Sequence, residues 1–351
     1  MHYVILFSVL LLSALPGYAQ RDSCKTKLIH HAALLKAESM AINNRQLHDN
    51  KLIRVYFRVF RNNNGSNVAA SLADINMEFA QLQVAYQNKN ICFANMGMDY
   101  INNTDLNIGI DVDEIATYQD LFQFVIPDCI TIFYHANLTD AGGTAYSIPN
   151  TFLSVQRDNI GAMNTLAHEV GHCLGLLHTH ETAYGFGYIN GSECTQNGDR
   201  VCDTPADPWS FNGILPCFSN NNCMYTGNCT DPNGGSLYSP PYSNIMSYWG
   251  SAGCVVNDFT DGQITRAHTF LFADENLQAI QSPGTLSYGP ATHSSGLLLK
   301  SAINSFTTSG QVMLSNSNTA NIQANEIILL PGFTAAPTSG QVTIKPVSCI
   351  Y

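Results

Sequence analysis

Apolar and polar residues alternate along residues 52–60, and this period of two predicts a strand with one buried face. That face would carry Ile53, Val55, Phe57 and Val59. Ser71 and Asp74 have the spacing of a capping box, which predicts the start of a helix. The apolar stripe of this helix would be Leu72, Ile75, Phe79, Leu82 and Tyr86. Further strands are expected near 91–101, 130–135 and 152–156.

A second helix is expected to begin near Asp158 or Asn159, either of which could cap it. Its core side would carry Ile160, Met163, Ala167, Val170 and Leu174. Thr260 and Gln263 form another capping box, and the helix they open should run to about Gln278. The order strand, helix, strand, strand, helix predicts an α/β (α+β) upper subdomain with a mixed twisted sheet.

Regular patterning fades between about 180 and 255, where Gly, Asn, Pro and Cys are frequent. This composition predicts an irregular lower subdomain stapled by disulfides, with a cleft between the two subdomains. We therefore expect the main folded domain over 51–283. Residues 284–351 alternate short β-type runs with turns, which predicts a small C-terminal β module for surface attachment, sorting or stability.

Residues 1–19 have the pattern of a signal peptide, with an apolar run from Val4 to Leu15 and small residues before the expected cleavage point. The run is shorter than the roughly 20 residues that span a bilayer. No other stretch of the sequence is apolar enough to do so. The polar residues 20–50 predict a propeptide, removed near Arg45 or Lys51. We expect a secreted, monomeric protein that does not insert into membranes.

Composition agrees with export. The 351 residues contain 26 acidic and 15 basic side chains, for a net charge of −11. This balance argues against nucleic acid or anionic membrane as the main partner. Only 12% of the residues are charged, which is common outside the cytoplasm, and the 11 cysteines of an exported chain predict disulfides.

The segment from His168 to His178 carries the clearest chemical signal. On a helix, His168 and His172 project from one face, and Glu169 lies beside them. Gly175 can adopt the left-handed conformation that ends a helix, so the chain can turn back and bring His178 to the same point. Three neutral nitrogen ligands leave one zinc position open to water, which is the arrangement of a catalytic site.

The full HExxHxxGxxH spacing resembles the metzincin metallopeptidases. Downstream, Asn244 to Tyr248 matches the metzincin turn whose methionine, here Met246, forms an apolar floor under the zinc histidines. Together with the loop 197–205, Cys254 and the segment 259–266, the set resembles the pappalysin family and its bacterial cytophagalysin-like branch. The resemblance covers roughly residues 50–280 and implies a metzincin-like fold.

The resemblance also implies a zinc metalloendopeptidase that acts on extended peptides. Glu169 would accept a proton from the zinc-activated water and pass it to the leaving amine, and Tyr248 would help to stabilise the oxyanion. Residues 140–149 would form either the edge strand that holds the peptide or an ordinary loop. Two alternatives use the same sequence: a catalytically silent secreted adhesion protein, and a zinc amidase or esterase.

The cysteines give further expectations. In relatives the pattern pairs Cys217 with Cys254, and Cys194 with Cys223 or Cys229, so Cys202 would take the cysteine left over. Cys92 and Cys129 would pair if their strands are neighbours, and Cys173 would be a buried free thiol. Cys24 either occupies the open zinc position of the proenzyme, as a propeptide cysteine does in relatives, or forms a disulfide with a cysteine such as Cys349.

Two loops bear on calcium and on specificity. The loop 193–207 is rich in the oxygen ligands that Ca²⁺ prefers, and relatives bind structural calcium on their Asp-Thr-Pro loop; the alternative is a solvated acidic turn. Its oxygen donors are Glu193, Asp199, Asp203, Thr204 and Asp207. Some relatives select a basic residue after the cleaved bond through an acid that follows the methionine turn. Residues 249–253 contain no acid, so we expect an apolar or broad preference.

Overall fold

The computed structural model describes residues 49–111, 119–208, 220–221, 223–225, 230–231, 237–347 and 349. The predicted signal peptide, most of the propeptide with Cys24, and the cysteines Cys217 and Cys229 lie outside the described residues. Within the described part, no helix has both the length and the apolar character that crossing a bilayer requires.

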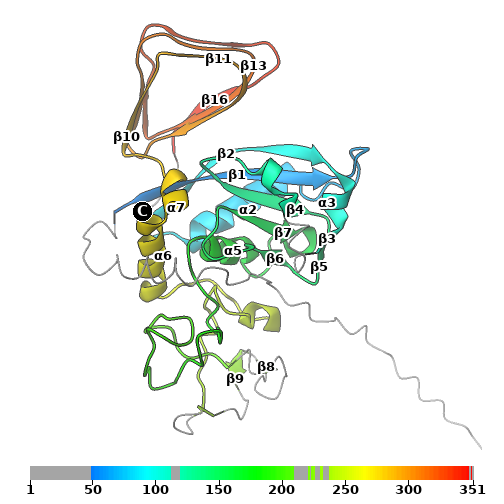
Figure 1. Ribbon diagram of the computed structural model, residues 1–351, viewed down its shortest axis with the longest axis vertical. Coiled ribbons are helices and arrows are strands. Elements are labelled where there is room, and N and C mark those ends of the chain that lie inside the picture. Colours follow the sequence, from blue (N-terminus) through cyan, green and yellow to red (C-terminus); the bar gives the residue numbers. More distant parts are fainter. Residues whose placement is uncertain are drawn as a thin grey trace, which may run out of the picture.

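A five-stranded sheet forms the centre of the upper subdomain (Figure 1). Its strands, in the order β2-β1-β4-β7-β6, are β2 (Ile91–Asn102), β1 (Lys51–Arg61), β4 (Ile130–His135), β7 (Phe152–Gln156) and β6 (Gly143–Thr144). The first four run parallel, and β6 pairs antiparallel with β7 at one edge. The predicted mixed sheet is confirmed, and residues 143–144 form the expected edge strand.

The inner strand β1 is buried on both faces. Its odd-numbered residues from Ile53 to Val59 pack in the main core with α2 (Leu72–Ala85) and α5 (Thr165–Cys173). On the opposite face, Leu52 and Tyr56 pack against residues from the C-terminal part of the chain, including Val347. The predicted alternation therefore identifies the helix-covered face, and the second face is apolar because a later segment covers it.

Two of the predicted helix starts are confirmed by their caps. The Ser71 hydroxyl accepts a hydrogen bond from the backbone N–H of Asp74 and opens α2. Thr260 and Gln263 form the same reciprocal contacts at the start of α6 (Asp261–Ala273). This helix does not continue to Gln278, because Asp274 ends it and caps a separate short helix, α7 (Glu275–Ala279).

The predicted start of the histidine-bearing helix is wrong. α5 begins at Thr165, and the residues around Asp158 form only the 3-10 turn η3 (Arg157–Asn159). Met163 and Asn164 both have positive φ angles, 53° and 52°, which a right-handed helix cannot contain. The apolar spacing through residues 160–163 resembled a helical stripe, but this segment is a tight turn leading into α5.

Short elements complete the upper and lower parts of the molecule. They are α3 (Thr104–Ile108), β3 (Ile110–Asp111), η2 (Phe122–Phe124), β5 (Leu138–Thr139), β8 (Asn220–Asn221), β9 (Met224–Tyr225) and η6 (Trp249–Ala252). Irregular chain separates α5 from α6 over most of the described residues, as the composition of this region predicts.

Residues 285–345 wind into a parallel β-solenoid with a triangular outline (Figure 1). Its strands are β10 (Thr285–Tyr288), β11 (Ala291–Ser301), β12 (Ser305–Thr308), β13 (Val312–Gln323), β14 (Glu326–Ile328), β15 (Phe333–Pro337) and β16 (Val342–Lys345). Ala291 pairs with Val312 and Val312 with Phe333, which gives a repeat of 21 residues. Leu286, Phe306 and Ile327 likewise stack in adjacent coils.

The solenoid packs on the outer face of the sheet next to edge strand β2. Cys92 of β2 forms a disulfide with Cys349, and the Gln323 amide donates a 2.5 Å hydrogen bond to the carbonyl of Asn95 in β2. The predicted Cys92–Cys129 bond is therefore wrong. β1 separates β2 from β4, so the two cysteines lie two strand spacings apart, beyond the roughly 7 Å that a disulfide can bridge.

Of the other predictions for the cysteines, some are wrong and one is confirmed. Disulfides join Cys194 to Cys202 and Cys223 to Cys254, with Cα–Cα distances of 4.9 and 5.5 Å. The pairings expected for Cys194 and Cys254 are wrong, because irregular loops place these cysteines where their spacing in the sequence gives no guide. The alternative Cys24–Cys349 bond is also wrong, since Cys349 is bonded to Cys92. Cys173 is a buried free thiol, as predicted.

Candidate active site

Three histidine side chains converge at the end of α5. The Nε2 atom of His172 lies 3.1 Å from Nε2 of His168 and 3.1 Å from Nε2 of His178. In the described part of the chain, this is the one group of three or more His, Cys, Asp or Glu residues arranged to share an ion. Three imidazole nitrogens that point toward one another at this distance are the arrangement expected of metal ligands.

The outer nitrogens of two rings have fixed partners. His168 Nδ1 lies 2.6 Å from the carbonyl oxygen of Ile245, and His172 Nδ1 lies 2.8 Å from that of Leu176. A carbonyl only accepts, so each Nδ1 carries the hydrogen and each Nε2 keeps its lone pair for a metal. Burial lowers the pKa of His168 to about 4 and that of His172 well below its usual value, which keeps both rings neutral. The residues present therefore fit a zinc ion.

The turn after α5 brings the third histidine back. Gly175 has a φ of +91°, the left-handed conformation predicted from the sequence. A Cβ at this position would also collide with the ring of Phe270 from α6. Only glycine meets both requirements, and the reversal places His178 opposite the histidines of the helix.

Glu169 is fully buried and faces the edge strand β6. A Cβ built on Gly143 would lie 2.8 Å from both Cγ and Oε1 of Glu169. The carboxylate therefore fills the space that a larger residue in β6 would need. This contact places the acid between the three histidines and the strand edge expected to hold a peptide.

The methionine turn lies beneath the histidines. A Cβ on Gly171 would lie 2.5 Å from the sulfur of Met246, so the thioether packs directly on the α5 backbone. Met246 is fully buried, and its carbonyl accepts a hydrogen bond from the backbone N–H of Thr179. The turn thus contacts both the helix and the segment that follows His178.

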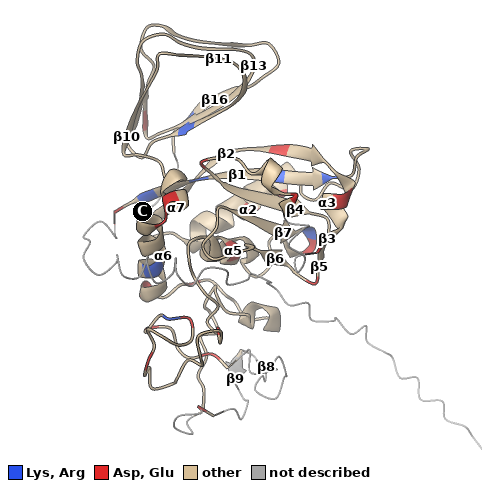
Figure 2. Ribbon diagram, viewed as in Figure 1, with Lys and Arg blue, Asp and Glu red and all other residues tan. Residues whose placement is uncertain are grey.

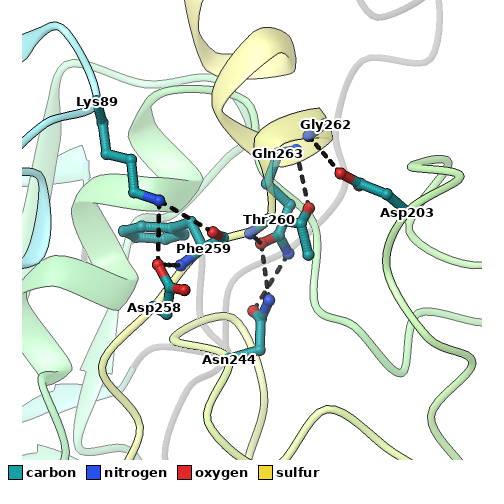
Figure 3. Close-up of polar contacts among 8 residues, drawn as sticks. All are labelled: Lys89, Asp203, Asn244, Asp258, Phe259, Thr260, Gly262 and Gln263. Carbon is teal, nitrogen blue, oxygen red and sulfur yellow. Dashed lines mark hydrogen bonds and ion pairs between the residues drawn. The ribbon is translucent and has the colours of Figure 1, made fainter.

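Helix α6 holds this turn in place (Figure 3). The side-chain amides of Asn244 and Gln263 exchange two hydrogen bonds, of 2.8 and 3.2 Å. Asn244 Oδ1 also accepts from the backbone N–H of Met246. Since the next carbonyl, that of Ile245, holds His168, a chain of hydrogen bonds links the first turn of α6 to a predicted metal ligand.

Tyr248 lies beside the histidines, as predicted. Its ring centroid is 4.8 Å from that of His178 and 4.4 Å from that of His180. The His180 ring also stacks on His178, with a centroid distance of 4.9 Å and an interplanar angle of 17°. The five residues predicted for the site, His168, Glu169, His172, His178 and Tyr248, are therefore together. The sequence motif does not include His180, which is buried and forms a wall of the site.

A cavity of about 270 Å³ opens next to the histidines. Its lining is formed by Met163, Thr165, His168, Glu169, Ser247, Gly250, Ser251 and Val256. Apart from Glu169 and His168, which belong to the site, every lining residue is uncharged. The cavity is narrow at Gly250, where a Cβ would lie 3.1 Å from side-chain atoms of Met163 and Val256.

The acidic residues of the loop 193–207 have separate surroundings. Glu193 accepts a hydrogen bond from Asn197, Asp203 accepts one from the backbone N–H of Gly262 (Figure 3), and Asp207 accepts from Thr179 and Trp249. These donors are Asn197 Nδ2, Gly262 N, Thr179 Oγ1 and Trp249 Nε1. Glu193, Asp203 and Asp207 therefore each have a different partner.

Asp199 differs from the other acids of the loop. It is 5% exposed, and its carboxylate lies within hydrogen-bonding reach of the Thr204 hydroxyl. Burial raises the pKa of Asp199 to about 7. Both residues line a cavity of about 330 Å³ within this loop.

The chain is similar in sequence to known metalloproteases. The Peptidase_M43 family, described as pregnancy-associated plasma protein-A, matches residues 134–272. An extracellular metalloprotease of Colletotrichum graminicola is 30% identical over 239 residues, covering 62% of this chain and 76% of that protein. One from Sordaria macrospora is 29% identical over 238 residues, covering 62% and 74%. Human pappalysin-1 is 29% identical over 138 residues, which are 37% of this chain and 8% of pappalysin-1.

Among solved structures, mirolysin in complex with compound 9 is similar with a TM-score of 0.47 and 18% identity, over 66% of this chain and 96% of that one. A mutant of Tannerella forsythia promirolysin has a TM-score of 0.46 and 16% identity, over 74% and 97%.

Proposed function

This chain belongs to the pappalysin family of metalloproteases, and we propose that it is a secreted zinc endopeptidase in which Glu169 is the general base. The observation that carries the proposal is the convergence of three neutral imidazoles beside one buried carboxylate. His168, His172 and His178 would hold the zinc ion. When bound, zinc supplies Lewis-acid chemistry and lowers the pKa of a coordinated water toward neutrality.

The protein's own residues would have separate roles in the reaction. Glu169 takes the proton of the attacking water and delivers it to the leaving amine. Tyr248, beside His178, donates a hydrogen bond to the oxygen on which negative charge develops. The Ile245 and Leu176 carbonyls keep two of the imidazoles in the tautomer that binds metal.

We propose that the substrate is an extended peptide that adds to the edge of β6. This strand ends the sheet and contacts Glu169, so a peptide paired with it would pass the predicted catalytic acid. The side chain after the cleaved bond would enter the 270 Å³ cavity. The uncharged lining around Ser251 and Val256 favours an uncharged side chain there, in keeping with the absence of an acid in residues 249–253.

We also propose that the N-terminal segments direct secretion and are then removed. Residues 1–19 would be a signal peptide and 20–50 a propeptide, with the catalytic domain over 51–283 and the C-terminal module over 284–351. Several relatives are named extracellular metalloproteases, which supports export. N-terminal sequencing of the protein recovered from culture medium tests these boundaries.

We also propose a structural calcium ion on the loop 193–207. Asp199 and Thr204 support it, since they offer two buried oxygens close together in the same loop. A divalent cation would keep the Asp199 carboxylate ionised inside the protein. Added calcium should raise the melting temperature, and an unchanged melting temperature would contradict the proposal.

Casein and gelatin cleavage test the proposed activity. The purified mature protein should cleave both, a chelator should abolish cleavage, and added zinc should restore it. Loss of all cleavage in a protein that still binds one zinc ion would instead support the alternative, a silent binding protein. Cleavage that survives complete zinc removal would overturn the proposal.

A further inference from the structure

We propose that Asp207 is a positioning residue of the active site, which sets the distance between the loop bearing His178 and the segment bearing Tyr248. This inference rests on the proposed function for the roles of those two residues. It concerns a residue that touches neither the predicted metal position nor the substrate cavity.

Asp207 joins two segments that are far apart in the sequence. Its Oδ2 accepts a 2.6 Å hydrogen bond from the hydroxyl of Thr179, the residue directly after His178. The same carboxylate accepts from the indole N–H of Trp249, directly after Tyr248, at 3.2 and 3.3 Å. One side chain therefore holds the immediate neighbours of both predicted functional residues.

Burial makes these contacts strong. Asp207 is 8% exposed, Thr179 is 4% exposed and Trp249 is completely buried. Low solvent access strengthens a hydrogen bond, because water competes less for the donor and the acceptor. Without the carboxylate, a buried indole N–H and a buried hydroxyl would both lose an acceptor.

The geometry of the site depends on the two segments that Asp207 connects. The rings of His178 and Tyr248 are 4.8 Å apart and nearly perpendicular, at 72°. The backbone N–H of Thr179 also donates to the carbonyl of Met246, so the segments are joined on two sides of the histidine cluster. If the carboxylate were removed, the two segments would keep this backbone contact and the ring contacts of Tyr248 but would lose their shared side-chain acceptor.

Asp203 provides a matched control in the same loop. Its Oδ2 accepts from the backbone N–H of Gly262 at the start of α6, so it contacts neither the Tyr248 segment nor Thr179 (Figure 3). Replacing either acid by asparagine removes one negative charge from one loop. A purely structural contribution should therefore appear in both variants, and a positioning role should appear only in the Asp207 variant.

The experiment compares Asp207→Asn and Asp207→Ala with Asp203→Asn in the full mature chain, at constant calcium. Three quantities are measured: kcat and KM on a quenched peptide, the zinc dissociation constant by competition with a chelator, and tryptophan emission. The chain has two tryptophans, so a Trp209→Phe background leaves Trp249 as the only emitter. Trp249 reports directly on whether its contact with Asp207 is lost.

We expect Asp207→Ala to lower kcat by about 10- to 100-fold and to weaken zinc binding by about tenfold or more, with KM changed by less than about threefold. Trp249 emission should shift. Asp203→Asn should leave Trp249 emission unchanged and should lower kcat far less than Asp207→Ala does. Combining Asp207→Ala with Trp249→Phe should cost little more than Asp207→Ala alone, because both remove the same contact.

Two results would overturn the inference. One is an Asp207→Ala protein with wild-type kcat and zinc affinity; the other is a fall in kcat that Asp203→Asn reproduces. Failure of the proposed function looks different, because the wild type itself would then lack zinc-dependent cleavage. If the Ala variant does not fold, Asp207→Asn keeps one acceptor oxygen and gives the same comparison.

Discussion

The link between α6 and the methionine turn gives a quantitative prediction. Gln263→Ala removes three hydrogen bonds: the two exchanged with Asn244, at 2.8 and 3.2 Å, and the 3.0 Å bond from the backbone N–H of Thr260. Asn244 is 4% exposed, so water cannot easily replace its lost partner. Because Asn244 also holds the N–H of Met246, the change should reach the Ile245 carbonyl and His168.

The magnitude follows from these contacts. Each hydrogen bond contributes a net stability of roughly 1 kcal/mol, so the variant should lose about 3 kcal/mol. In a domain of this size, that loss corresponds to a melting temperature lower by roughly 6–12 °C. Loss of the support behind a metal-binding imidazole should also weaken zinc affinity by about tenfold or more.

The other capping box provides the control. Asp74→Ala removes the side-chain half of the capping box at the start of α2, where these hydrogen bonds are exposed to solvent. It should cost about 1 kcal/mol and leave zinc affinity unchanged. Calorimetry and chelator competition measure both effects. If Gln263→Ala lost stability but bound zinc as tightly as Asp74→Ala, the proposed route from α6 to His168 would be refuted.

Four further predictions follow from single contacts. Glu169→Gln should lower kcat by about 10²- to 10⁴-fold while the protein still binds one zinc ion, and appreciable activity would exclude the general-base role. Ser251→Asp places an acid in the cavity wall and should shift cleavage toward Arg or Lys by about tenfold in a peptide library; an unchanged profile would show that the cavity does not select the residue after the cleaved bond. In calcium-free buffer, Asp199 keeps its proton up to about pH 7 when folded but loses it near its usual pKa of 3.8 when unfolded, so the free energy of unfolding should fall as pH rises between these values. Urea unfolding of Asp199→Asn should lack that slope. Replacing Cys92 and Cys349 by serine removes a disulfide between residues that are 257 apart in the sequence. Calorimetry should show that the free energy of unfolding falls by about 2–5 kcal/mol. An unchanged free energy of unfolding would mean that attachment of the solenoid does not stabilise the fold.

The features predictable from the sequence were those with a local cause. Alternation along residues 52–60 identifies β1 because a strand with one core face must alternate. The caps at Ser71 and Thr260 identify their helices because they satisfy backbone N–H groups within four residues. The spacing from His168 to His178 needs only one helix and one left-handed glycine, so the local sequence is enough to bring the three rings together.

The features that could not be predicted depend on distant segments. Cys92 pairs with Cys349 because the solenoid folds back on β2, and nothing near either cysteine indicates this. The sequence predicts the solenoid only as short β-type runs, although its apolar positions recur every 20–22 residues. Among residues 284–347, only Lys300, Glu326 and Lys345 are charged (Figure 2), so charge patterning did not reveal the repeat.

The site shows why such distant contacts matter for chemistry. The ring of His168 is oriented by Ile245, Glu169 packs against Gly143, and Phe270 packs against Gly175 in the turn after α5. Each partner comes from a different element, so the helix alone can supply the ligands but cannot fix their geometry. Substitutions in α6 or β6 should therefore alter zinc affinity or kcat although these elements contain no predicted ligand. We therefore expect activity to depend on the residues that pack around the histidines as much as on the motif itself.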